Sequence, residues 1–564
     1  MSEIPDSSYV RRLSAEFRRR GRYWRAIGFV LCLFLCAPLA AADHFVCDCA
    51  TGAAPGCVAG NDAAAGNSPA TAWRSYDRAQ DAWSGLAAGD SIHFCRGGVF
   101  PIAGSTQWLN TQCTAAQRCG IEAYSAAWAS GGEARPRLVQ SSGHGFNFAN
   151  AGDAAPDGGY RVRDLELACT ACTNDDWGLF FFNDVDDVRL ERLRITGFGI
   201  GVHLAGSNPC GSDPGCDGHS SRIELVDSEI EGNRTQGWLG AGDDLLLAGN
   251  RFAGNGTGTV FQHNVYLSQS NGATHRIRVV RNALYRSAAS ASGSCQGGSF
   301  AVHGEHTDLL IEGNTIREDL GAADPACWGL GITPAYGTPE GFVRTIVRGN
   351  TFRNVGNIAI ALGSCQDCVV ENNVIVGEQS FGGIGIAAPA VARAADDLPL
   401  ARLTVRNNSL YLTAPSSIGI RLGDEGSQHV VVSNALHSTT TSGSWSCLSL
   451  NLAFGAYAAV DNNVCGFVTG AGREWEQGSG SLAAWRAASG FDAASLAVAP
   501  GFASPAGPGF QLEAASASAA MVGAGHASAS SPTEFYGASR TVPPDAGAYQ
   551  YGTSDRLFRD GFGG

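Results

Sequence analysis

Between residues 233 and 463 the chain repeats one short pattern of apolar and polar positions nine times. Each copy has a run of β-branched or leucine residues, a polar or glycine step, an asparagine and another apolar residue, as in residues 245–252 and 309–316. The asparagines are Asn233, Asn250, Asn282, Asn314, Asn350, Asn373, Asn408, Asn434 and Asn463. Their mean spacing of about 29 residues predicts a solenoid, because one turn of this size cannot bury its apolar face and must stack on the next.

The pattern predicts strands, since its apolar runs are short and rich in Val, Ile and Leu, whereas a helical repeat needs apolar residues three and four apart over a longer stretch. A second, alternating strand precedes each asparagine pattern. In residues 264–267 the alternation places Val265 and Leu267 toward the core and Asn264 and Tyr266 toward solvent. We therefore predict two strands per coil. Asparagine tolerates the left-handed backbone of a sharp turn, so we expect its amides to hydrogen-bond from coil to coil as a ladder.

These strands resemble those of the right-handed parallel β-helix proteins of the pectate-lyase-like superfamily. Residues 72–79 and 88–94 are similar to the capping helix and first strand of secreted β-helices, and residues 534–540 and 545–549 to their closing segment. The chain departs from that pattern at residues 516–519, where the usual serine-proline step is absent. The resemblance implies an all-β fold, a single-stranded right-handed parallel β-helix of roughly 10–12 coils, with a short N-terminal capping helix.

The N-terminus has the three zones of a secretory signal peptide. Seven arginines occur by residue 25, followed by the apolar run 26–37 and the small residues Ala40, Ala41 and Ala42. An uncleaved membrane anchor is the alternative, but the apolar run is shorter than the ~20 residues of a spanning helix. We expect a secreted or periplasmic monomer without stable membrane insertion after signal removal. The expected divisions are a signal peptide (1–42), an N-terminal cap with the first strand (43–100), a parallel β-helix with its closing coil (101–552) and a mobile tail (553–564).

The chain has 18 cysteines, of which Cys32 and Cys36 fall in the predicted leader. Most of the others lie in near pairs, which predicts disulfides that staple loops in an oxidising compartment. The predicted pairs are Cys113 with Cys119, Cys169 with Cys172, Cys210 with Cys216, Cys365 with Cys368 and Cys447 with Cys465, and Cys295 with Cys327 would join neighbouring coils. Zinc is the alternative, but the two Cys-x-x-Cys motifs are 193 residues apart, which disfavours it.

All 38 basic residues are arginine. The absence of lysine excludes any lyase scheme in which a lysine is the general base. The net charge of −14 repels polyanions at long range, so nucleic acid is not expected as a partner. A uronate polymer would need a local arginine patch or a bridging Ca²⁺. The glycine-rich residues 197–201 precede no helix that would bind phosphate, and no organic cofactor is expected.

Catalysis on a solenoid needs side chains that stand on one sheet in consecutive coils. Placing Val202, Val265, Val302 and Ile332 at equivalent inward positions puts an outward row at one level. That row consists of His203, Tyr266, His303 and Thr333. Polar side chains are densest between residues 243 and 306, which places the expected groove there.

A β-elimination on a uronate needs a base, an acid and a cation that stabilises the enolate. Tyr266 with His303 or His263 would supply base and acid, because histidine titrates near neutral pH. This arrangement resembles the Tyr/His chemistry of some polysaccharide lyases and epimerases. Arg276, or a Ca²⁺ held by Asp243 and Asp244, would neutralise the carboxylate. The expected substrate-binding residues are Asn264, His203, Trp328 and Tyr336, the last two by stacking on sugar rings.

Two alternatives remain beside the lyase. A glycoside hydrolase on the same fold would use Asp243 and Asp244 as its pair of carboxylates, although adjacent acids after a strand are more often turn formers. A non-catalytic polysaccharide-binding or adhesin-like scaffold would leave Tyr266 and the histidines on a solvated face. A scaffold should spread its polar side chains evenly, whereas here they concentrate between residues 243 and 306, and this favours an enzyme acting on a polysaccharide.

Overall fold

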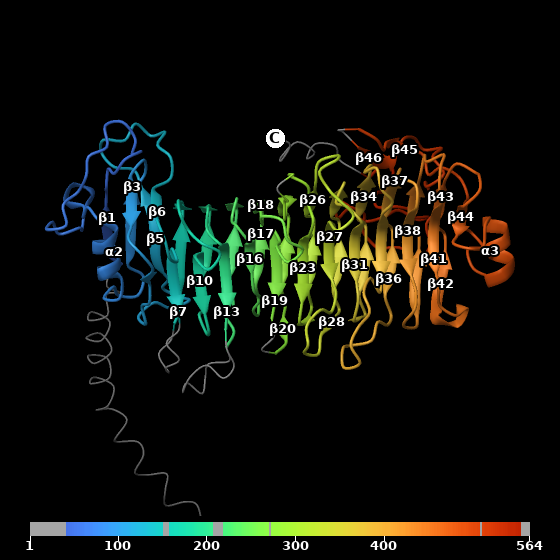
Figure 1. Cartoon of the computed structure of the whole chain (residues 1–564), viewed down its shortest axis with the longest axis horizontal. Coiled ribbons are helices and arrows are strands. Elements are labelled where there is room, and N and C mark those ends of the chain that lie inside the picture. The colour runs from blue at the N-terminus through green and yellow to red at the C-terminus, as the bar shows by residue number, and fades with distance from the viewer. Residues whose placement is uncertain are drawn as a thin grey trace, which may run out of the picture. The chain divides into compact units, whose positions relative to one another are not determined.

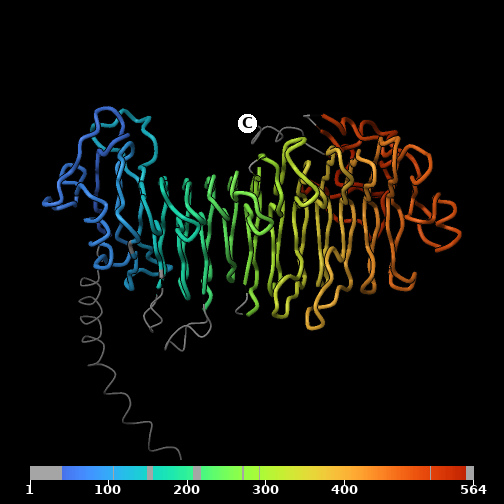
Figure 2. The backbone as a smooth tube through the Cα atoms, viewed as in Figure 1, coloured from blue at the N-terminus to red at the C-terminus, as the bar shows by residue number. Residues whose placement is uncertain are grey.

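The computed structural model describes residues 41–149, 157–206, 218–269, 272–290, 292–507 and 510–553. Most of the predicted signal peptide, the predicted pair Cys210 and Cys216, and the tail from residue 554 lie outside them. From residue 43 onward the described residues form one compact unit, in which successive coils stack along one axis from the blue to the red end of the chain (Figures 1 and 2). Three long parallel sheets, here named A, B and C, run along this stack. The fold is a right-handed parallel β-helix.

Sheet A has 14 strands. In spatial order they are β1 (Asp43–Val46), β2 (Ser91–Cys95), β5 (Cys119–Tyr124), β8 (Tyr160–Arg163), β11 (Arg189–Glu191), β14 (Glu224–Val226), β17 (Leu246–Ala248), β21 (Arg278–Val280), β25 (Leu310–Glu312), β29 (Ile346–Arg348), β33 (Val369–Glu371), β36 (Thr404–Arg406), β39 (His429–Val432) and β42 (Tyr457–Asp461).

Sheet B has 13 strands. They are β3 (Val99–Ile102), β6 (Arg137–Gln140), β9 (Glu166–Cys169), β12 (Arg194–Thr196), β15 (Glu229–Glu231), β18 (Arg251–Asn255), β22 (Ala283–Ser287), β26 (Thr315–Arg317), β30 (Thr351–Arg353), β34 (Val374–Gly377), β37 (Ser409–Leu412), β40 (Ala435–His437) and β43 (Val464–Gly466).

Sheet C also has 13 strands. They are β4 (Thr106–Gln107), β7 (Phe146–Ala149), β10 (Trp177–Phe182), β13 (Ile200–Ala205), β16 (Gln236–Leu239), β19 (Val265–Ser268), β23 (Gly298–His303), β27 (Trp328–Ile332), β31 (Ile358–Leu362), β35 (Ile384–Ala388), β38 (Ser417–Leu422), β41 (Trp445–Leu450) and β44 (Arg473–Glu476).

Short elements complete the fold. A four-stranded parallel sheet precedes sheet A in the middle coils, and its strands are β20 (Thr274–His275), β24 (Glu305–Thr307), β28 (Gly341–Val343) and β32 (Cys365–Gln366). β45 (Phe502–Ser504) and β46 (Gln511–Ala514) pair antiparallel. The helices are η1 (Pro69–Thr71), α2 (Tyr76–Trp83), η2 (Phe454–Ala456) and α3 (Leu482–Ser489).

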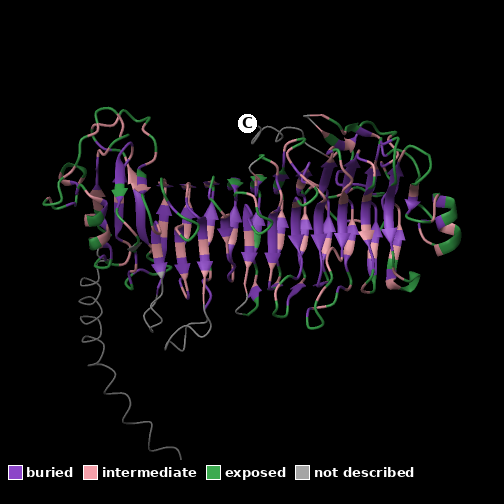
Figure 3. Ribbon diagram, viewed as in Figure 1, coloured by how far each residue is buried: buried purple, intermediate pink, exposed green. Residues whose placement is uncertain are grey.

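The prediction of two strands per coil is wrong, because each asparagine pattern contains two strands. In one coil β17 ends at Ala248, Asn250 makes the turn, and β18 begins at Arg251. The apolar residue after the asparagine, Phe252 in this coil, is a buried core residue of sheet B. Each coil therefore has three strands. Their inward side chains form one continuous apolar core, and Figure 3 colours the buried residues of these strands purple. The 13 or 14 strands of each sheet slightly exceed the expected 10–12 coils.

The asparagine ladder is confirmed between sheets A and B. From Asn250 to Asn434 each side-chain Nδ2 donates to the Oδ1 of the asparagine in the next coil, at 2.9–3.1 Å, and Asn463 is the last acceptor. Asn233 does not belong to this ladder. It lies at the turn from sheet B to sheet C, where its Nδ2 donates to Asn255 at 2.9 Å, and Ser228 takes its place before Asn250.

The N-terminal end is closed by the capping helix α2, as expected. The side-chain oxygen of Ser75 accepts a hydrogen bond from the Arg78 amide and so caps the helix. Tyr76 and Trp83 are buried on the core side of α2, and the Tyr76 hydroxyl accepts from the indole of Trp108 at 2.7 Å. These aromatic contacts cover the apolar end of the first coils, which would otherwise face water.

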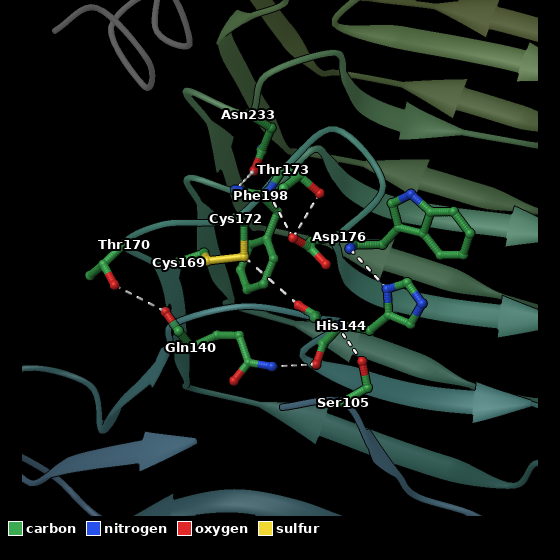
Figure 4. The surroundings of a disulfide bond; sticks show 12 residues. Ser105, Gln140, His144, Cys169, Thr170, Cys172, Thr173, Asp176, Phe198 and Asn233 are labelled. Atoms are coloured by element: carbon green, nitrogen blue, oxygen red, sulfur yellow. Dashed lines mark hydrogen bonds between the residues drawn. A yellow bond between two sulfur atoms is a disulfide. The ribbon is translucent and has the colours of Figure 1, made fainter. Parts of the chain in front are cut away.

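Seven disulfides join cysteines in the described residues. Five of the predicted pairs are confirmed: Cys113–Cys119, Cys169–Cys172, Cys295–Cys327, Cys365–Cys368 and Cys447–Cys465. Figure 4 shows one of them at a turn between sheets B and C. The other two, Cys47–Cys95 and Cys49–Cys57, lie in the N-terminal cap. Disulfides are typical of oxidising, extracytoplasmic compartments.

Within the described ranges, no helix has the length and apolar character needed to cross a membrane.

The buried carboxyl of Glu318 should make stability depend on pH. Its side chain lies at the turn after β26, where it accepts hydrogen bonds from the amide and hydroxyl of Ser287 at 3.0 and 3.3 Å. Burial raises its pKa from 4.5 to about 8. Between these values the folded chain holds a proton that the unfolded chain has lost, so stability falls as pH rises through this window.

Glu318→Gln should therefore unfold with a weaker pH dependence than the wild type. We expect wild type and variant to have similar melting temperatures near pH 4. At pH 9 the variant should melt at a higher temperature, because its unfolding free energy should exceed that of wild type by on the order of a few kcal/mol. Thermal unfolding followed by circular dichroism across this range measures the difference. The exposed Glu305→Gln is the control, and parallel curves for wild type and Glu318→Gln would contradict the expectation.

Candidate active site

The candidate site lies on the outer face of sheet C. Val265 and Leu267 of β19 are fully buried, so Tyr266 and Ser268 point outward from the same strand. In the register of the sheet, Tyr266 lies between Leu239 on one neighbouring coil and Ala301 on the other. The prediction that Tyr266 faces outward is therefore confirmed.

The predicted level of His303 is wrong by one outward position. Val265 pairs with Phe300 rather than with Val302, so His303 stands opposite Ser268. A shift of two residues keeps every side chain on its face of the sheet, and His303 still contacts Tyr266 diagonally. Their ring centroids are 5.5 Å apart at an interplanar angle of 85°.

Tyr336 joins this group from the loop between β27 and β28. Its hydroxyl is 2.9 Å from the Tyr266 hydroxyl and 2.5 Å from the Ser268 hydroxyl. Its ring centroid is 5.3 Å from that of His303. The structure thus brings together three predicted residues, Tyr266, His303 and Tyr336, and adds Ser268, which continues the outward alternation of β19.

Glu340 contacts this cluster on its buried side. Its side chain is fully buried, and its carboxylate accepts hydrogen bonds from the amides of Gly304 at 2.6 Å, Ala335 at 2.5 Å and Tyr336. It also lies 3.7 Å from Nδ1 of His303. Burial alone would raise the pKa of Glu340, but the nearby His303 ring and the hydrogen bonds from the backbone amides lower it below its usual value, so the carboxylate is ionised.

One hydrogen bond of the His303 ring indicates which of its nitrogens carries the proton. Its Nδ1 lies 2.5 Å from the carbonyl oxygen of Thr333, which only accepts, so Nδ1 carries a proton. In the neutral ring Nε2 then has the lone pair and can accept a proton from a substrate.

Tyr266 and His263 are both neutral in this environment. Burial, with the hydrogen bond to Tyr336, raises the pKa of Tyr266 well above its ordinary value, so the phenol keeps its proton and can act as an acid. His263 lies 4.9 Å from Tyr266 between ring centroids, and its Nδ1 is 2.7 Å from the Gly298 carbonyl. Burial lowers the pKa of His263 to about 4. Its ring packs behind Tyr266.

His203 lies in the same outward row as Tyr266, separated from it by Leu239. Its ring packs edge-on against Trp177, with centroids 4.5 Å apart, and burial lowers its pKa to about 4. A cavity of about 160 Å³ is lined among others by His203, Leu239 and Ser268. A neutral histidine therefore forms one wall of this cavity.

Asn264 does not face the groove, contrary to the alternation. It is fully buried, and its Oδ1 accepts a hydrogen bond from Asn255 at 2.9 Å, so it extends the asparagine contacts at the turn from sheet B to sheet C. Trp328 does lie on the outer face of sheet C. It stands opposite Gly298 and Ile358 and packs partly buried in an external apolar cluster.

Arg276, Asp243 and Asp244 lie at the turns that precede sheet A and not on sheet C. Arg276 forms a bidentate pair with Asp244, at 2.6 and 2.8 Å, and this pair lowers the pKa of Asp244. Asp243 accepts a hydrogen bond from the His275 amide at 2.7 Å.

The same Arg–Asp pairing recurs along the stack. The equivalent pairs are Arg222–Asp187, Arg344–Asp308 and Arg402–Asp367. All eight residues of these four pairs have positive φ, between 53° and 61°. Arg276 and Asp244 are therefore one rung of a repeated surface ladder at a sharp turn.

The donor set of Asp243 and Asp244 does not fit the expected Ca²⁺, because Arg276 and a backbone amide already engage both carboxylates. Two other groups of potential metal ligands occur in the described residues, Cys47 with Cys49 and Cys57, and Cys295 with Glu318 and Cys327. Every cysteine in them is disulfide-bonded, so its sulfur is not a thiolate ligand.

Sequence reasoning missed Glu340 for a physical reason. The loop from Thr333 to Glu340 has no period, so nothing in it predicts that the glutamate turns back under His303. The single hint was the nearby Tyr336, which was expected to contact sugar.

No protein-family model and no curated protein matches the sequence. Among solved structures, the chain is similar to an alginate lyase from Paenibacillus sp. str. FPU-7, with 15% identity, a TM-score of 0.31 and coverage of 68% of this chain and 97% of the other. It is also similar to a PL6 family polysaccharide lyase from Pseudopedobacter saltans, with 13% identity, a TM-score of 0.39 and coverage of 75% of this chain and 90% of the other. A third similar structure is a GH136 lacto-N-biosidase from Eubacterium ramulus, with 11% identity, a TM-score of 0.39 and coverage of 82% of this chain and 68% of the other. Likenesses this weak carry no argument about activity, and the assignment of the fold rests on the three parallel sheets.

Proposed function

We propose that this protein is a polysaccharide lyase that cleaves a uronate-containing polymer by β-elimination on the outer face of sheet C. The observation that carries the proposal is the Tyr266, His303 and Tyr336 cluster with the ionised Glu340 beneath it. It combines a histidine whose free nitrogen can take a proton with a phenol that keeps one. These are the two proton-transfer groups that an elimination needs.

The proposed reaction starts with removal of the proton beside the uronate carboxyl group by Nε2 of His303. The electron pair of that C–H bond forms a carbon–carbon double bond, and the bond to the leaving glycosidic oxygen breaks. Tyr266 donates its phenolic proton to that oxygen. His303 then releases its proton to solvent and the Tyr266 phenolate regains one, for which the hydroxyls of Tyr336 and Ser268, 2.5 Å apart, provide a hydrogen-bonded path from solvent.

The roles first expected for Arg276, Asp243 and Asp244 are not part of this proposal. Arg276 is committed to its pair with Asp244 on the surface ladder, and no step is routed through Ca²⁺. The same pairing disfavours the hydrolase alternative, because a general acid or base must be free to exchange protons with the substrate.

Incubation of the purified protein with acidic and neutral polysaccharides, with and without added Ca²⁺, tests the proposal. Ultraviolet absorbance of unsaturated uronates and new reducing ends should appear together on at least one acidic polymer. Reducing ends without absorbance would overturn β-elimination in favour of hydrolysis. Absence of both signals on the whole panel would favour the scaffold alternative.

A further inference from the structure

The outer face of sheet C continues beyond the cluster as a row of small residues that ends at an arginine. In register, Tyr266 is followed by Ala301, Gly331, Ala361, Ala387 and then Arg421. Five strand spacings of ~4.8 Å place Arg421 about 24 Å from Tyr266 along the stack. Ile420 and Leu422 are fully buried, so the arginine side chain points outward, as Tyr266 does.

The floor between these two side chains suits a sugar chain. Four consecutive rungs carry only glycine or alanine in this row, and these small residues are buried beneath larger neighbouring side chains. The neighbouring outward row carries Trp328, Ile358 and Ile384, which pack on Ala361 and Ala387 in one external apolar cluster. Such a surface can contact the apolar faces of sugar rings, whose hydroxyls remain in water.

At the far end the floor meets a cavity of about 650 Å³. It is lined by residues 389–395 and by Arg421, Asp424, Glu425 and Asn451. Its volume is in the range of sites that bind small molecules. The cavity therefore offers space at the point where the row of small residues ends.

One of the two arginines that line this cavity forms no direct ion pair. Arg393 pairs with Glu425 at 2.8 Å, and Glu425 also accepts from the Leu400 amide at 2.6 Å. Asp424 is exposed at the rim. Within the described residues Arg421 has no hydrogen-bond or ion-pair partner. In a chain of net charge −14, a guanidinium without a carboxylate partner is a ready site for an anion.

We propose that Arg421 forms a carboxylate-binding subsite for an acidic glycan, five rungs from Tyr266 on the same face of sheet C. The proposal rests on the proposed function, since it extends the groove that contains Tyr266 and His303. Arg421 would pair with a uronate carboxylate, while the apolar row beside Ala361 and Ala387 contacts the intervening sugars. The distance makes this subsite specific for chains long enough to span about 24 Å.

Direct binding measurements separate this subsite from catalysis. Isothermal titration of polygalacturonate, alginate and a neutral glucan against wild type, Arg421→Gln and Arg421→Lys gives affinities that need no turnover. We expect Arg421→Gln to weaken binding of a polyuronate roughly tenfold, with partial recovery in Arg421→Lys and no change for the neutral glucan. Uronate oligosaccharides too short to span the groove should bind wild type and Arg421→Gln equally.

The matched control is Arg278→Gln, which removes the same charge from an exposed position on sheet A. Equal weakening in this variant would show a general charge effect and overturn the subsite, as would unchanged polyuronate binding by Arg421→Gln. Failure of the wild type to bind any of the uronates would also overturn it. If no polymer is cleaved but Arg421→Gln still loses affinity, the lyase proposal fails and the subsite stands.

Discussion

Tyr266→Phe is expected to lower the turnover number by roughly 10²- to 10⁴-fold, the usual contribution of a positioned proton donor. The substitution removes only the hydroxyl that would protonate the leaving oxygen. The phenyl ring keeps its edge contacts with His263 and His303, so the melting temperature should change little. Initial rates of ultraviolet absorbance on the cleaved polymer, together with thermal unfolding, measure both quantities.

The matched control is Tyr285→Phe. Tyr285 lies on sheet B, and its hydroxyl donates to Asp319 at 2.8 Å. This variant therefore also loses one hydrogen bond, but away from sheet C. Polyuronate binding by Tyr266→Phe should stay close to that of wild type, because the loss concerns the transition state. A turnover number within twofold of wild type would remove Tyr266 from the chemistry, and a large loss of affinity instead would make it a binding residue.

Asn314→Ala is expected to destabilise the fold by about 2–4 kcal/mol. The buried side chain of Asn314 donates to the Val279 carbonyl at 2.8 Å and to Asn350 at 3.0 Å. Its Oδ1 accepts from the backbone amide and the side chain of Asn282, at 2.9 and 3.0 Å. Alanine leaves these buried groups without partners, and the rungs on both sides lose their connection.

Chemical denaturation of wild type and Asn314→Ala, with the disulfides intact, measures this effect as a shift of the midpoint. Asn174→Ala is the control, since Asn174 is exposed and its side chain accepts one hydrogen bond from Arg234. A midpoint for Asn314→Ala equal to that of the control would mean that the ladder contributes no more than surface hydrogen bonds.

Several features of the fold followed from local pattern. The recurring asparagine predicted the solenoid and the ladder, because a residue that repeats once per coil lies next to its equivalent in the neighbouring coil. Cysteines close in sequence, such as Cys365 and Cys368, predicted their own pairing. Outward exposure of Tyr266 followed from the buried neighbours Val265 and Leu267. Each of these inferences concerns residues within one coil or at the same place in the next.

Other features needed contacts between coils. Nothing local distinguishes Asn264 from an outward residue, yet a break in the alternation turns it toward Asn255. Likewise Asp244 and Arg276 are 32 residues apart in sequence, and they pair because the turns of successive coils stack on each other. Because of that contact, both residues belong to the surface ladder of Arg–Asp pairs and not to the expected site.

The sequence by itself determined the kind of fold and the outward direction of Tyr266, since the two-residue period of a strand and the coil-length period of the solenoid are both local properties. Only the tertiary structure decided which outward side chains meet. The number of residues per coil varies from 23 to 36 along the ladder, and a slip of two residues leaves every side chain on its own face. The pattern therefore could not determine the register of His303 against Ser268, nor could it place Tyr336, 70 residues further along the chain, against Tyr266.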